Sequence, residues 1–127
     1  MKSNTPKLKR KLTKIFNEYI RTRDKGLRCI SCDKNIGTQA GHYLPTSLCP
    51  QPNMVFNPRN VNSQCSYCNL WLHGSQHDYA RGLIEKYGKH IIEELEEERR
   101  QKTEPWGTFQ YEVMIKHYKE KLCELQS

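Results

Sequence analysis

The stretches Cys29-Ile30-Ser31-Cys32 and Cys65-Ser66-Tyr67-Cys68 decide how this chain folds. In each stretch two residues separate a pair of cysteines, and this spacing lets two thiolates bind along one edge of a tetrahedral zinc ion. Cysteines of proteins that stay inside the cell serve as ligands more often than they form disulfides. The two pairs therefore predict one structural Zn²⁺ held by all four cysteines, with a disulfide framework or free thiols as the alternative.

The composition indicates why a chain of this size needs a metal. It has 127 residues and a mass of 15.1 kDa, of which 35% are hydrophobic, and its mean hydropathy is −0.90. This length suits one small domain with or without appended helices, and the low apolar fraction leaves little core per residue. A structural zinc supplies the stability that such a core lacks. The two remaining cysteines, Cys49 and Cys123, are interpreted as non-ligands.

The net charge of +7 comes from one end of the chain. Residues 1–28 carry ten basic and two acidic side chains, a net charge of +8, whereas the remaining 99 residues have a net charge of −1. We interpret this end as a cationic arm that binds a polyanion such as nucleic acid, with a merely solubilising terminus as the alternative. The candidate DNA contacts are Lys7, Lys9, Arg10, Lys11, Lys14, Arg21 and Arg23, together with Arg59 further along the chain.

Residues 1–28 lack the apolar segment of a secretory signal. No apolar run in the chain approaches the roughly 18 residues that a membrane span requires. The sequence therefore predicts neither a secreted protein nor a membrane protein.

The spacing of apolar residues predicts a mixed fold. Apolar side chains recur every three or four residues from Leu8 to Ile20, which predicts a helix over residues 6–25 with Thr5 as its N-cap. Glycine, proline and asparagine punctuate residues 26–67, which indicates short strands and loops. Helical spacing returns over residues 68–86, 89–102 and 108–126. We expect an α+β fold with a basic N-terminal helix or arm (1–28), a zinc-braced core (29–88) and a C-terminal helical extension (89–127).

Two polar residues between the cysteine pairs are not needed for a zinc knuckle. His42 lies in the stretch Ala40-Gly41-His42-Tyr43, and Asn60 lies in Phe56-Asn57-Pro58-Arg59-Asn60-Val61. A histidine at this place is either a catalytic group or a buried residue that braces a loop. Asn60 on its own also suits a turn.

Asn69 follows the second cysteine pair directly, and His73 comes four residues later. On a helix, residues four apart share one face, so this pair can present an amide oxygen and an imidazole to a second metal ion. The alternatives are a helix cap for Asn69 and a solvent-facing position for His73.

Taken in order, these residues resemble the zinc-braced HNH (ββα-metal) endonucleases, in which Cys-x2-Cys, His, Asn and Cys-x2-Cys-Asn follow one another. The chain as a whole is more similar to the NinG/Rap recombination proteins of bacteriophages. The similar stretches are 7–24, Cys29–Cys32, Ala40–Tyr43, Phe56–Val61 and Gln64–Asn69. The zinc-braced arrangement also resembles that of phage endonuclease VII, a junction resolvase. The resemblance thus implies a small ββα-metal core braced by a four-cysteine zinc site.

The resemblance assigns a role to each matching position. His42 matches the histidine that activates water, and Asn60 matches the asparagine that steadies the loop bearing it. Asn69 matches a ligand of the catalytic divalent metal, and His73 matches a second ligand found in some members, such as the colicin nucleases. Cys29, Cys32, Cys65 and Cys68 match the structural zinc site.

One position departs from the family pattern. Many members carry a metal-binding Asp directly before the histidine, where this chain has Gly41. The expected shell of the catalytic metal is therefore rich in His and Asn, or His42 is itself a ligand. Mg²⁺ or Mn²⁺ is expected there, with Zn²⁺ or Ni²⁺ as nitrogen-preferring alternatives.

The function expected from this resemblance is metal-dependent hydrolysis of DNA phosphodiesters, directed at branched recombination intermediates such as Holliday junctions and D-loops. Paired cuts at a junction favour a homodimer, and a phage origin places the protein in the cytoplasm of a bacterial host. The alternative is a non-catalytic zinc-finger module that binds DNA in phage recombination. That alternative accounts for the four cysteines and the basic arm but not for His42, Asn60 and Asn69.

Overall fold

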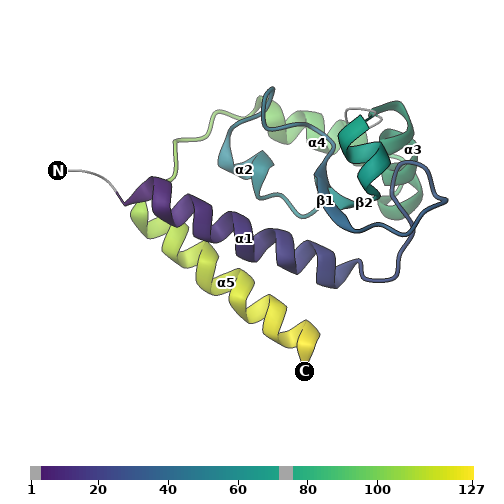
Figure 1. Ribbon diagram of the computed structural model, residues 1–127. Coiled ribbons are helices and arrows are strands. Elements are labelled where there is room, and N and C mark those ends of the chain that lie inside the picture. The colour runs from purple at the N-terminus through teal and green to yellow at the C-terminus, as the bar shows by residue number, and fades with distance from the viewer. Residues whose placement is uncertain (1–3, 72–75) are drawn as a thin grey trace.

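The computed structural model, which describes residues 4–71 and 76–127 except the side chain of Trp71, is a helix-rich α+β structure (Figure 1). Its elements in chain order are α1 (Thr5–Arg23), β1 (Gln39–His42), α2 (Pro52–Val55), β2 (Val61–Gln64), a short π-helix η1 (Tyr67–Trp71), α3 (Gln76–Tyr87), α4 (Ile91–Arg100) and α5 (Thr108–Gln126). The α+β class predicted from the sequence is confirmed. None of the described helices combines the length and the apolarity that crossing a membrane requires.

Helix α1 forms where the apolar spacing predicts it and packs along α5. It buries Leu12, Phe16 and Ile20, and Figure 1 shows α1 and α5 side by side. The rings of Phe16 and Tyr118 meet edge to face with centroids 4.9 Å apart. The predicted N-cap was wrong by one residue: Asn4 occupies that position because Thr5 already has helical geometry. The N-terminal and C-terminal helices are thus adjacent in space.

A second apolar cluster holds the other half of the chain together. Helix α3 contributes Tyr79 and Leu83 and α4 contributes Ile91 and Leu95, and these side chains are at most 1% exposed. Cys49 is buried in the same cluster, as expected for a cysteine that is not a ligand. The helices predicted over residues 89–102 and 108–126 are α4 and α5, and both pack against the rest of the chain.

The two strands form one antiparallel pair in which Gly41 faces Asn62 and His42 faces Val61. Helix α3 is fastened to both strands by one hydroxyl. The Tyr79 hydroxyl donates to the Gly41 carbonyl over 2.6 Å and accepts from the Asn62 N–H over 2.9 Å. This hydroxyl therefore holds β1, β2 and α3 in a defined relative position next to His42.

A buried carboxylate joins α1, β2 and α3. Asp24 is 2% exposed and accepts hydrogen bonds from Arg23 over 2.8 Å, Lys86 over 3.1 Å and the Ser63 N–H over 3.1 Å. Burial alone would raise the pKa of Asp24. The hydrogen bond and charge of Arg23, helped by Lys86, outweigh burial and lower that pKa below its ordinary value of 3.8.

We expect Asp24→Asn to lower the free energy of unfolding by about 3 kcal/mol, because two cations would lose their buried partner. A group with a lowered folded-state pKa stabilises the fold above its unfolded pKa and loses that effect as pH falls through the folded pKa. The difference between the wild type and the variant should therefore shrink below about pH 4. Urea unfolding across pH measures it. Glu18→Gln, which changes an exposed carboxylate of α1, is the matched control, and an equal loss in both variants would contradict the assignment.

Candidate metal centre and adjoining cleft

The two cysteine pairs meet in space. Cys29 and Cys32 lie in the loop after α1, and Cys65 and Cys68 lie where β2 leads into η1. All four sulfur atoms lie within 4.8 Å of one another, so the cluster can hold a zinc ion. Cys123 is exposed on α5 and, like Cys49, lies outside this cluster. The expectation that the four cysteines come together is confirmed.

Local backbone geometry presents the thiols. The Cys29 N–H donates to the Asn35 carbonyl over 2.7 Å, and the Asp33 N–H donates to the Cys29 carbonyl over 3.0 Å. Asp33 takes a left-handed conformation with φ of 53°, which Asp tolerates better than most residues. The first pair therefore lies in a tight turn. At the second pair the Cys68 N–H points at the Cys65 sulfur, 3.5 Å away.

The thiols in this cluster have unequal acidity. Burial raises the pKa of Cys29 and of Cys68, and neighbouring cysteines raise that of Cys68 further. Burial acts the same way on Cys65, but hydrogen bonds from the Cys68 N–H and the Asn35 amide outweigh it and lower its pKa to about 7. Four thiolates this close repel one another strongly unless a cation lies between them, so the donor set fits Zn²⁺.

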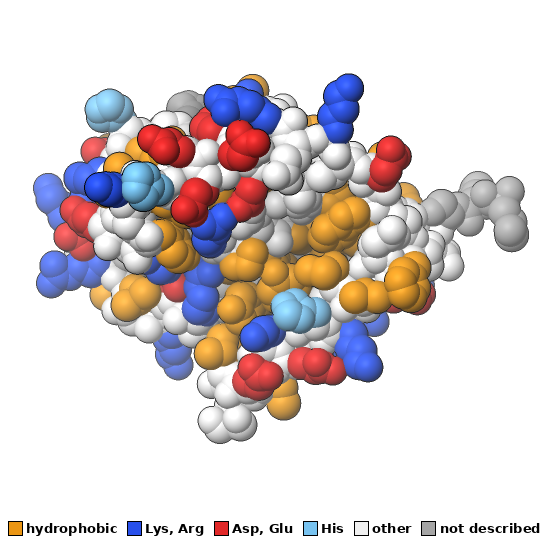
Figure 2. Space-filling model, turned by 180° about the vertical axis from the view of Figure 1, so that it is seen from behind, with side chains coloured by type: hydrophobic (Ala, Val, Ile, Leu, Met, Phe, Trp, Pro, Cys, Tyr) orange, Lys and Arg blue, Asp and Glu red, His pale blue; other side chains and the backbone are white. Residues whose placement is uncertain are grey.

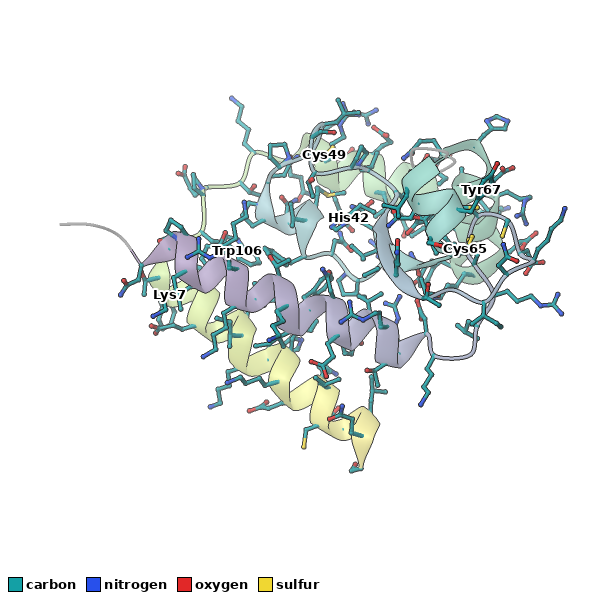
Figure 3. All side chains as sticks on the ribbon, viewed as in Figure 1. Lys7, His42, Cys49, Cys65, Tyr67 and Trp106 are labelled. Atoms are coloured by element: carbon teal, nitrogen blue, oxygen red, sulfur yellow. The ribbon has the colours of Figure 1, made fainter. Side chains whose placement is uncertain are left out.

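A cleft with a volume of about 440 Å³ is lined by both His42 and Asn69, the residue that follows Cys68. Its remaining walls come from β1, from the loop after β1 and from the start of α3, through Ala40, Pro45, Thr46, Ser47 and Gln76. Figure 3 shows His42 in the middle of the molecule, between the α1–α5 pair and the elements that carry the cysteines. Two residues that the sequence placed 27 positions apart thus share one cavity.

His42 is the last residue of β1, and one hydrogen bond sets the orientation of its ring. Its Nε2 lies 2.9 Å from the Val55 carbonyl oxygen. Because a carbonyl only accepts, Nε2 carries the hydrogen and Nδ1 keeps its lone pair. Burial lowers the pKa of His42 below 6.5, and the bond to Val55 opposes burial only partly. The neutral ring at neutral pH therefore offers one basic nitrogen.

Asn60 holds the segment that orients His42. Its side chain is 0% exposed; Oδ1 accepts from the Leu44 N–H over 2.8 Å, and Nδ2 donates to the carbonyls of Leu44 and Met54 over 3.1 and 2.9 Å. These bonds join both ends of the loop between β1 and Val55. Asn60 thus holds Met54, the residue before Val55, and Leu44, which is two residues after His42, while the Val55 carbonyl itself is bonded to the His42 ring.

Asn69 is oriented by a residue that the sequence did not single out. Its Nδ2 donates to Gln39 Oε1 over 2.8 Å. Its Oδ1 faces Gly41, at 3.1 Å from the position that a Cβ would take there. Asn69 thus presents an oxygen next to the backbone that carries His42.

Packing explains why glycine precedes His42. A Cβ on Gly41 would lie 1.8 Å from Gln64 Oε1, and Gln64 is fully buried with its Nε2 bonded to Ser31 over 2.8 Å. An aspartate therefore does not fit at position 41 without displacing Gln64. No sequence pattern pointed to Gln39, Gln64 or the bridging Tyr79, because their roles depend on partners from distant segments.

The remaining candidates fall into three groups. His73 lies outside the described residues. Lys7, Lys9, Arg10, Lys11, Lys14 and Arg21 are exposed on α1. Arg23 and Arg59 differ from these six because their guanidinium groups are engaged within the chain, Arg23 with Asp24 and Arg59 with Glu94 and Glu98. The assignment of all eight basic residues as DNA contacts stays a prediction.

We expect Cys68→Ser to abolish zinc binding and cooperative unfolding, because structural zinc sites supply much of the folding free energy of small domains. Metal analysis of the purified protein and circular dichroism on heating measure both effects. Cys123→Ser, which changes an exposed thiol, should keep about one zinc ion per chain and the wild-type Tm. Full zinc content in Cys68→Ser would contradict the site.

Gly41→Ala should lower the free energy of unfolding by about 1–3 kcal/mol, the usual cost of forcing extra atoms into a packed interior. It should also disturb Gln64 and Asn69, which NMR spectra of side-chain amides report. Gly107→Ala is the control, because the nearest atom to its added Cβ lies 3.4 Å away. Equal stability of the two variants would show that Gln64 moves aside freely.

Comparison with known proteins places the chain in a family. A family model described as the bacteriophage lambda NinG protein matches residues 2–127. The chain is 36% identical over 112 residues to protein ninG of Salmonella phage P22 and 34% identical over 113 residues to protein ninG of Escherichia phage lambda. Each match covers 87% of this chain and 53% of the relative, so the chain spans about half the length of the curated relatives it matches. No solved structure matches it significantly. The family model covers nearly every residue, and the chain therefore belongs to the NinG family.

Proposed function

We propose that this NinG-family chain is a metal-dependent DNA endonuclease with a zinc-braced HNH core. The observation that carries the proposal is the His42 ring, whose Nε2 is bonded to the Val55 carbonyl over 2.9 Å while the cleft beside it also receives Asn69. A ring held in one tautomer next to an amide oxygen suits general-base chemistry beside a cation. The order β1, β2 and then a helix is the order that the ββα-metal resemblance implies.

In the proposed reaction His42 acts as the general base. Its Nδ1 takes a proton from a water molecule, the hydroxide oxygen forms a bond to phosphorus, and the bond from phosphorus to one ester oxygen of the DNA breaks. The lowered pKa of His42 keeps the ring neutral and able to accept that proton at neutral pH. Asn60 supports this arrangement indirectly, because it bonds the carbonyl of Met54, next to the Val55 whose carbonyl holds the ring.

Asn69 and His73 are the proposed ligands of the catalytic metal. The protein donors of this metal ion are neutral, since Gly41 supplies no carboxylate. A bound Mg²⁺ or Mn²⁺, or Zn²⁺ or Ni²⁺ with more nitrogen ligands, would offset the negative charge that develops on the phosphate. Gln39 acts as a positioning residue, because its hydrogen bond to Nδ2 turns the Asn69 oxygen toward Gly41 and the His42 backbone.

DNA is the proposed partner, and α1 the proposed grip. The six exposed cations of α1 stand on a helix that runs alongside the sheet bearing His42 (Figure 1). Phosphate contacts from such side chains supply affinity without sequence preference. Branched recombination intermediates such as Holliday junctions and D-loops are proposed from the family resemblance. Paired cuts at a junction need two active sites, so we propose a homodimer acting in the cytoplasm of the bacterial host.

Exposed apolar side chains offer a candidate surface for that dimer. Figure 2 shows hydrophobic side chains gathered in the middle of the face opposite to Figure 1, with charged side chains above and below them. On α5, Phe109 is 74% exposed and Val113 is 46% exposed. Exposed apolar groups of this kind are typical of contact surfaces between proteins.

We expect His42→Ala to lower the rate of DNA cleavage by about 100-fold or more, since general bases contribute factors of this size. Four-way junctions, flaps and linear duplexes, each incubated with Mg²⁺ or Mn²⁺, are the substrates. His90→Ala, which changes an exposed histidine at the N-cap of α4, should cleave like the wild type. Zinc content and Tm of both variants should match the wild type.

Two outcomes would overturn the proposal. Full cleavage by a clean His42→Ala preparation would remove His42 as the base. Tight DNA binding by the wild type, with no cleavage of any of the three substrates under either metal, would favour a non-catalytic zinc-binding DNA module.

A further inference from the structure

The cations of this protein divide into paired and unpaired ones. Those on α3 and α4 make ion pairs with acids of the chain, through Arg81, Lys86, Arg99 and Arg100. Within residues 4–71 and 76–127, no ion pair forms at the six exposed cations of α1 or at the three lysines of α5. Together α1 and α5 carry ten cationic and four acidic side chains, so most of the net charge of +7 lies on this helix pair.

Four of the unpaired lysines line one groove between the two helices. Two hollows of about 330 and 380 Å³ share Leu8, Lys11 and Glu112 in their walls, so they adjoin and we treat them as one groove. Lys7 and Lys11 come from α1, and Lys116 and Lys119 come from α5. We call this feature the α1–α5 groove. Helix packing brings together lysines that are more than 100 residues apart in the sequence.

The floor and the acids of the groove limit what can bind there. Leu8 and Ile115 contribute apolar surface. Glu112 and Glu120 offset only part of the charge of the four lysines, so the groove keeps an excess of positive charge. Both glutamates are exposed, and neither makes an ion pair with a lysine of the groove among the described residues. Unpaired ammonium groups side by side repel one another, and a ligand with several negative charges relieves that repulsion.

The groove continues into a longer cationic stripe. Lys7, Lys11, Lys14 and Arg21 follow one another at intervals of four, three and seven residues, so they share one face of α1. Glu18 lies on the same face between Lys14 and Arg21, which leaves this face with four cations and one acid. Fourteen residues of helix span about 21 Å. The stripe therefore runs from the groove to the end of α1 that leads into the zinc-binding loop. The length of this stripe suits an extended polyanion and exceeds what a single phosphate needs.

We infer that the α1–α5 groove binds the phosphate backbone of a DNA arm, with Lys116 and Lys119 of α5 as phosphate contacts. The inference rests on the proposed function only in taking DNA as the partner, and it does not require that the DNA is cut. Lysines act as point charges on phosphates and read no base, so the contact holds DNA of any sequence. Helix α5 then serves as the second wall of the DNA grip as well as the packing partner of α1.

The test measures DNA binding by a His42→Ala background without added Mg²⁺ or Mn²⁺, so that affinity is read without cleavage. The double variant Lys116→Gln/Lys119→Gln should bind a four-way junction several-fold more weakly. The slope of log K against log salt should become shallower by about 1.8, because each lost phosphate contact changes it by about 0.9. Glu112→Gln/Glu120→Gln should bind more tightly, a change that misfolding does not produce.

The matched control is Lys102→Gln/Lys121→Gln, which removes the same charge from exposed lysines that do not line the groove. Equal affinity and salt slope in the two lysine variants would overturn the inference, even if the wild type cleaves DNA. The inference would also be overturned if Lys116→Gln/Lys119→Gln bound a polyglutamate peptide more weakly but bound DNA with unchanged affinity. That result would favour an acidic protein partner. Absence of DNA binding by every form would overturn it together with the proposed function. Groove-dependent binding without cleavage would support it while the nuclease proposal fails.

Discussion

The meeting of four cysteine sulfurs within 4.8 Å is the constraint on which the rest of this structure depends. The cluster joins the loop after α1 to the end of β2, and η1 begins inside it with Cys68 followed directly by Asn69. The position of the cluster therefore determines where the Asn69 oxygen lies relative to the strand that carries His42. In a chain with so few apolar residues, a metal ion held by the four cysteines would supply stability that the small core does not.

A second constraint is the set of buried polar side chains in and around the β1–β2 pair. Asn60, Asn62, Gln64 and Tyr79 are all fully buried, and each makes hydrogen bonds across segments that are distant in sequence. Hydrogen-bonded polar groups in an interior favour one arrangement, since another would break these bonds without replacing them with water. The same packing requires glycine before His42. The absence of an acidic side chain at this position thus has a steric cause, and the described residues that line the cleft offer only neutral donors.

Much of the fold could be predicted because its signals are local. The apolar spacing of α1, α4 and α5 identified these helices to within one or two residues, and the cysteine spacing predicted the cluster that the structure shows. The N-cap of α1 was misplaced because both Asn4 and Thr5 are good capping residues, and only the backbone geometry separates them. The ion pairs between distant segments could not be predicted, since only the packing of α3 and α4 brings Lys86 to Asp24, and Glu94 and Glu98 to Arg59.

The sequence alone determined the α+β class, the four clustered cysteines, the basic α1 and the residues from which a site could be built, because spacing and charge are properties of neighbouring residues. Only the tertiary structure decided which of these residues act together. It brought His42 and Asn69 to one cleft, assigned Gln39 to orient Asn69, and divided the cations into those paired within the chain and those left unpaired on α1 and α5. The physical reason is that a hydrogen bond or an ion pair depends on a distance of a few ångströms, and helix and strand packing sets that distance for residues remote in sequence.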